Sequence, residues 1–118
     1  MATSLVLHEE SDCRELIRRV LLEYGYEVTT FAEEEEALAW TRLHPVDFAI
    51  VSLEPGIVQS KICHALKKLS DNLEILVLTS YANRDLATQA LEQGADDYLL
   101  KPIEIKKLEA KLRSIITR

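Results

Sequence analysis

The sequence predicts an α/β domain, because short apolar runs alternate with amphipathic helical segments five times along the chain. The third apolar run, Phe48–Val51, is continuous, as is typical of a central strand in a parallel sheet that is covered on both faces. No linker, repeat or low-complexity segment interrupts the 118 residues. We therefore predict one doubly wound (βα)5 domain over residues 1–118, with a five-stranded parallel sheet, helices on both faces and right-handed crossovers.

The first strand is predicted over Ser4–Leu7, and Ser11 is expected to cap the helix that follows. Gly25 comes after that helix, where a left-handed cap is expected. Residues 26–30 alternate in polarity, which indicates a strand at a sheet edge. One face of the first helix is apolar and is expected to pack on the sheet: Leu16, Ile17, Val20, Leu21 and Tyr24.

Four acidic residues, Glu33–Glu36, open the second helix, where they are favourable because they meet the positive end of the helix dipole. The later strands are predicted at residues 74–78 and 98–100, and Gly94 ends the fourth helix. The inward faces of helices two to five are expected to be Ala37, Leu38 and Thr41; Val58, Ile62, Ala65, Leu66 and Leu69; Leu86, Ala87, Ala90 and Leu91; and Ile105, Leu108, Leu112, Ile115 and Ile116.

Charge and composition exclude several function classes. The net charge of −6 and the pI near 5.1 argue against nucleic-acid binding, since phosphate contacts need a basic face. No apolar run approaches the ~20 residues that span a bilayer, so we expect no membrane contact and a cytoplasmic location. Cys13 and Cys63 lack a CxxC spacing and are interpreted as free thiols in a reducing compartment.

In a doubly wound sheet, functional residues gather at the carboxyl ends of the strands. The polar residues predicted to lie at that edge are His8, Glu9, Glu10, Ser52, Thr79 and Lys101. His8 and Glu9 could bind a transition metal with Glu54, although two or three scattered ligands are weak evidence for such a site. The alternative is that His8 is an exposed residue at the end of the first strand. No GxGxxG or Walker pattern is present, so a small-ligand or nucleotide-binding module is the least favoured hypothesis for the function.

Three segments carry a family resemblance: Ala90–Pro102, Leu78–Ser80 and Val6–Glu10. In their joint order and spacing they resemble the receiver domain of bacterial response regulators over essentially the whole chain. The resemblance implies a flavodoxin-like sheet with strand order 2-1-3-4-5. It also implies that Lys101 and Pro102 are joined by a cis peptide bond, and that Tyr98 is the aromatic residue whose rotamer reports activation.

In that family an acidic pair after the first strand and an aspartate at the end of the third strand hold Mg²⁺. The aspartate takes a phosphoryl group from a kinase phosphohistidine, and a threonine and a lysine bind that group. By position, this chain keeps Thr79 and Lys101. It departs from the pattern at His8, at Ser52, which stands in the place of the aspartate, and in a following loop that is one residue short.

We therefore predict an atypical receiver, a pseudo-receiver without enzyme activity or resident cofactor and with weakened Mg²⁺ binding. It is expected to act in two-component signal transduction, a phosphorelay or transcription regulation through phosphorylation-independent protein–protein interaction or dimerisation. It is either a whole protein or the N-terminal part of a longer regulator. The alternative is an active phosphotransfer receiver that uses Mg²⁺ and a relocated acceptor at Glu9, Glu10 or Glu54.

The expected contact surface for a protein partner, or for self-association, lies on the fourth helix and fifth strand. It comprises Tyr98, Ala87 and Leu91, by resemblance to the family. Trp40, the only tryptophan, is expected to be half-buried, with an exposed docking patch as the alternative. Within the pocket, we expect Lys101 to pair with Glu9 or Glu10, because an ammonium at a partly buried edge needs compensation.

Overall fold

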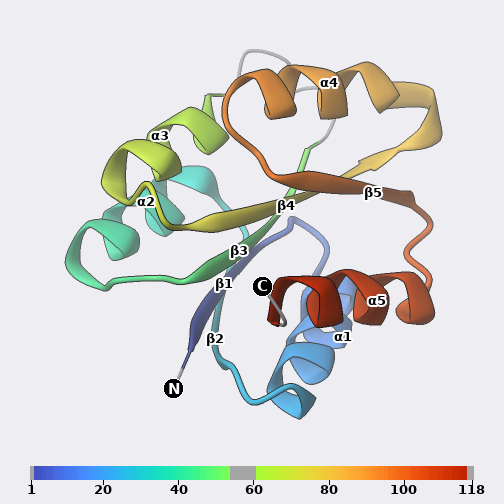
Figure 1. Ribbon diagram of the computed structural model, residues 1–118, viewed down its shortest axis with the longest axis horizontal. Helices are drawn as coiled ribbons and strands as arrows, with labels where there is room; N and C mark the ends of the chain where they lie inside the picture. The colour runs from blue at the N-terminus through green and yellow to red at the C-terminus, as the bar shows by residue number, and fades with distance from the viewer. Residues whose placement is uncertain (1, 54–60, 117–118) are drawn as a thin grey trace.

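The computed structural model describes residues 2–53 and 61–116 and has the predicted architecture, a parallel sheet of order β2-β1-β3-β4-β5 between two helical layers (Figure 1). Glu54 and Val58, named above, lie outside the described residues, as does the loop before Gly56. The elements are β1 (Thr3–Leu7), α1 (Ser11–Glu23), β2 (Glu27–Phe31), α2 (Glu34–Leu43), β3 (Phe48–Ser52), α3 (Ile62–Leu69), β4 (Glu74–Ser80), the 3-10 turn η2 (Tyr81–Asn83), α4 (Arg84–Glu92), β5 (Asp97–Lys101) and α5 (Ile105–Ile116).

Side chains that alternate along each strand build two separate cores. On one face, Leu5, Ala49 and Val77 pack under α2, α3 and α4. On the other face, Val6 and Ile50 pack under α1 and α5, together with residues such as Ile17, Leu21, Leu108 and Leu112. All of β3 is buried, which explains why its sequence is a continuous apolar run.

Parallel pairing brings the carboxyl ends of the strands to one edge. Leu7 of β1 pairs with Val51 of β3, and Ser52 pairs with Leu78 of β4. Farther along the sheet, Ser80 of β4 pairs with Lys101 of β5. The order of the strands therefore places the ends of β1 and β4 on either side of Ser52.

Several predicted details of the helices differ in the structure. Leu16, Leu69 and Leu91 were expected to face inward but are exposed, since each lies at the margin of its helix's apolar stripe. Ser11 is the first residue of α1 rather than its cap, which is Glu10. Gly25 has a φ of +87°, as expected for a left-handed cap.

One partly buried ion pair ties α3 to the loop before β5. Lys67 Nζ lies 3.0 Å from Asp96 Oδ2, and the same carboxylate oxygen accepts the Ile75 N–H at 2.8 Å. Lys67 Nζ also donates to the Leu73 carbonyl. Gly94 adopts a φ of +116°, and a Cβ there would lie 3.0 Å from Lys67 Cγ. The contacts of Asp96 with Lys67 and Ile75 therefore hold the segment between α4 and β5 against α3 and β4.

Both cysteines are free thiols, as predicted. Cys63 is buried under the α2–α3–α4 face, and this burial raises the pKa of its thiol to about 12. Cys13 is partly accessible on α1. Within the part of the chain that is described, no helix is both long enough and apolar enough to cross a membrane.

Candidate functional site

Ser52 closes β3 and is 5% exposed, so its hydroxyl lies at the carboxyl edge of the sheet but below the surface. The Lys101 ammonium, at the end of β5, donates to Ser52 Oγ at 2.6 Å. The lysine thus keeps a direct contact with position 52 although that residue is neutral. The additional pairing of Lys101 with Glu9 or Glu10 stays a prediction.

His8 is buried at 1% exposure, which corrects the expectation of an exposed histidine at the end of a strand. The backbone N–H of His8 donates to the Phe31 carbonyl at 3.0 Å, so the pairing with β2 continues one residue past β1. Its Nδ1 accepts the Glu10 N–H at 3.1 Å, which places the proton of a neutral imidazole on Nε2. The ring is therefore an integral part of the loop, whereas Glu9 and Glu10 are exposed.

Arg14 holds this loop from the first turn of α1, a role that the sequence reasoning missed. Its guanidinium donates to the His8 carbonyl at 2.7 Å and to the Glu9 carbonyl at 3.0 Å. A basic residue seven positions after the end of a strand is the only signal in the sequence, and it is a common one. The consequence is that the backbone of the β1–α1 loop is fixed independently of its carboxylates.

Thr79 is fully buried at the end of β4 and directs its hydroxyl toward the following turn. The Thr79 Oγ1 hydroxyl donates to the Asn83 carbonyl at 3.2 Å, and Asn83 Nδ2 donates to Ser80 Oγ at 2.7 Å. The three residues form a small network that joins β4 to η2 and the start of α4. In this arrangement the Thr79 proton is already engaged.

One hollow that the described residues form beside Ser52 is small. A hollow of about 30 Å³, lined by His8, Glu9, Glu34 and Ser52 among others, has the size of roughly one water molecule. A second, larger hollow of about 250 Å³ lies beside Lys101 and is lined mainly by apolar atoms of α1 and of the segment after β5. Cys13 lines it, and burial, with the Glu10 carboxylate, raises the pKa of its thiol against the opposing effect of Lys101.

These donors do not fit Mg²⁺ as a set. The ion prefers several oxygen ligands in octahedral geometry. Here a buried imidazole stands after β1, and the hydroxyl at the end of β3 is bonded to an ammonium. Within residues 2–53 and 61–116, no group of three or more His, Cys, Asp and Glu side chains is arranged to hold a metal ion.

The response regulator receiver domain model matches residues 5–113 of this sequence. The chain belongs to the response regulator receiver domain family. A probable transcriptional regulator, ycf27, of Cyanophora paradoxa is 37% identical over 115 residues, which cover 97% of this chain and 48% of that protein. The chain spans about half the length of the curated relatives it matches.

Solved structures agree with this assignment. A putative response regulator from Chloroflexus aurantiacus superposes with a TM-score of 0.85 at 32% identity, over 99% of this chain and 98% of that one. A response regulator protein from Burkholderia pseudomallei superposes with a TM-score of 0.80 at 30% identity, over 93% of this chain and 65% of that one. The Burkholderia structure contains a phosphorylated aspartic acid, a calcium ion and citrate.

The predicted contact residues of this receiver domain differ in accessibility. Tyr98 and Leu91 are each 40% exposed on β5 and α4, whereas Ala87 is 2% exposed. Ala87 faces the core because it lies on the buried side of α4 with Leu86 and Ala90, so its place in a contact surface is wrong. Trp40 is half-buried, as predicted. It packs against Phe31 and stacks on His44, with ring centroids 4.6 Å apart.

Proposed function

We propose that this receiver domain is a pseudo-receiver, which acts in signal transduction or transcription control without accepting a phosphoryl group. The observation that carries the proposal is the bond between the Ser52 hydroxyl and the Lys101 ammonium. In the receiver family, the residue that corresponds to Ser52 is an aspartate, and this aspartate attacks the phosphorus atom. A serine hydroxyl needs a general base to become a nucleophile, and the lone pair of Ser52 Oγ is already engaged by the Lys101 ammonium.

The loop after β1 supports the same proposal. A buried imidazole that accepts a backbone N–H replaces one carboxylate of the acidic pair. Mg²⁺ neutralises charge on a transferred phosphoryl group, so weaker Mg²⁺ binding removes a second requirement of the reaction. Both changes lie in one pocket, while the cores that build the fold are complete.

The domain would then act by contact with a protein partner or a second copy, through the surface formed by α4 and β5. Tyr98 and Leu91 are exposed apolar side chains on these adjacent elements. Tyr81 of η2, which is also exposed, has the Arg84 guanidinium stacked over its ring at 4.8 Å. Exposed aromatic and arginine side chains of this kind are enriched at protein interfaces.

Mass spectrometry after incubation with acetyl phosphate and Mg²⁺ tests the proposal. The natural sequence is expected to remain unlabelled, and the matched variant with His8→Asp and Ser52→Asp is expected to gain a phosphoryl group at position 52. Mg²⁺-dependent labelling of the natural sequence would contradict the proposal. Mapping of that label to Glu9, Glu10 or Glu54 would establish a relocated acceptor instead.

A further inference from the structure

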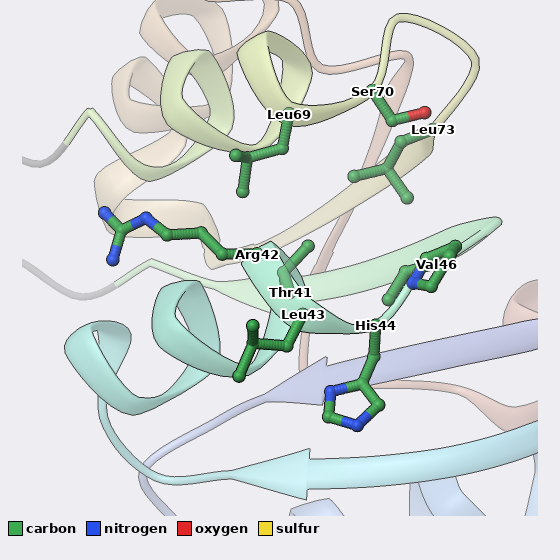
Figure 2. Close-up of a pocket in the computed structure, with 9 residues that line it drawn as sticks. Thr41, Arg42, Leu43, His44, Val46, Leu69, Ser70 and Leu73 are labelled. Carbon is green, nitrogen blue, oxygen red and sulfur yellow. The ribbon is translucent and has the colours of Figure 1, made fainter.

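A further hollow lies at the edge of the sheet opposite Ser52, where α2 and α3 both end (Figure 2). Its volume is about 300 Å³, near the lower end of the range for sites that hold a small molecule or a bulky side chain. In Figure 2, Leu69 and Leu73 extend from the α3 side toward Thr41 and Leu43 of α2. Nothing in the Ser52 pocket contributes to this hollow.

The lining of the hollow combines a buried floor with an exposed apolar rim. Leu73 and Val46 are buried members of the core and form the floor. Leu43 is 80% exposed, the highest value among the large apolar side chains of the described residues, and Leu69 is 41% exposed. Exposed leucines that adjoin a concave surface are typical of sites that another molecule covers.

The charges around the rim indicate what that molecule is. Within the described residues, most basic side chains bond to a carboxylate, a hydroxyl, a carbonyl or an aromatic ring. The basic side chains for which no such contact is found are Arg42, Lys61, Lys68 and Lys106. Arg42 lines the hollow, and Lys68 precedes Leu69 in the last turn of α3.

Arg42 at the hollow and Lys68, which is exposed and precedes Leu69 in sequence, therefore carry positive charges with no carboxylate partner among the described residues, in a chain whose net charge is −6. Asp71, in the turn after Ser70, is exposed and offsets part of this charge. A second copy placed hollow to hollow would bring Arg42 against its own equivalent. Charge complementarity thus favours a different, acidic partner.

We propose that this hollow is a docking site for an acidic amphipathic segment of a partner protein. One apolar side chain of the segment enters between Leu43 and Leu69, and its flanking carboxylates pair with Arg42 and Lys68. The inference does not rest on the state of the Ser52 pocket, because the two sites lie at opposite edges of the sheet. It adds a second interaction surface to that of α4 and β5.

Selection of a randomised displayed peptide library against the whole chain tests the docking site. Enriched peptides are expected to combine acidic residues with one large apolar residue. Their affinity is expected to fall roughly tenfold or more in Leu43→Ser and in Arg42→Glu. Leu22→Ser on α1 and Lys106→Glu on α5 change exposed residues on the opposite face of the sheet; they are the controls and are expected to leave the affinity unchanged.

Trp40 provides the direct readout, because it stacks on His44, which lines the hollow. Its fluorescence is expected to change on binding, with an affinity that weakens as salt is added. The inference is overturned if the selection yields no binder, if the peptides are basic, or if both variants bind as well as the controls. Dimerisation that Leu43→Ser abolishes in sedimentation experiments would replace the acidic partner with a second copy.

Discussion

Removal of the Ser52 hydroxyl is expected to destabilise the folded domain through the loss of one charge-assisted hydrogen bond. Lys101 Nζ and Ser52 Oγ are 2.6 Å apart, and a hydrogen bond to a charged group is worth roughly 1.5–3 kcal/mol. The ammonium is only half-buried, so water can replace the lost acceptor in part. We therefore expect Ser52→Ala to lower the free energy of unfolding by about 1.5 kcal/mol, at the low end of that range.

A double-mutant cycle isolates this bond from the other contacts of the two residues. Urea unfolding of Ser52→Ala, Lys101→Met and the double variant is expected to give a coupling energy of about 1 kcal/mol or more. Ser4, whose buried hydroxyl donates to the Glu27 carbonyl at 2.9 Å, supplies the matched control. Ser4→Ala is expected to destabilise without coupling to Lys101. A coupling energy between Ser52 and Lys101 no larger than that between Ser4 and Lys101 would contradict this expectation.

Three further expectations concern the stability of the folded domain. Asp96→Ala removes both the ion pair with Lys67 and the acceptor of the Ile75 N–H, so it should lower the free energy of unfolding by roughly 2 kcal/mol in urea unfolding. Asp96→Asn should lower it by less. Gly94→Ala should lower the melting temperature more than Gly25→Ala does, because both glycines have a positive φ but only Gly94 lies against Lys67. Equal decreases in melting temperature would contradict this. The pKa of Cys63 is raised in the folded state to about 12, so its contribution predicts that the free energy of unfolding falls as the pH rises from about 9 towards 12, and that this fall is smaller in Cys63→Ala.

The sequence predicted the fold because the polarity patterns of its strands indicated the same sheet as the periodicity of its helices. The continuous apolar run at Phe48–Val51 indicated a strand covered on both faces, and all of β3 is buried. The alternating polarity after Gly25 indicated an edge strand, and β2 is the edge. The helix margins were less predictable, since the period of a helix shows the direction of its apolar face but not where the neighbouring element ends. Leu69 is exposed for that reason.

The candidate site was predicted at the level of residues but not of contacts. His8 was expected at a surface because its strand was predicted to end at Leu7, yet the pairing with Phe31 continues for one more step. The role of Arg14 depends on how α1 leans over the preceding loop, which no local pattern describes. The contact between Lys101 and Ser52 likewise depends on the register between distant strands, so no local pattern in the sequence could predict it.

The central claim is that this receiver domain has lost its phosphoryl acceptor. It is tested most directly by an amide NMR titration of the whole chain, with Mg²⁺ first and beryllofluoride, a mimic of the acyl-phosphate group, afterwards. A pseudo-receiver is expected to show no saturable shift at Ser52, Thr79, Lys101 or Tyr98 on the addition of beryllofluoride. Saturable shifts that spread from these residues to α4 would contradict it, because they require a carboxylate acceptor that still binds the mimic.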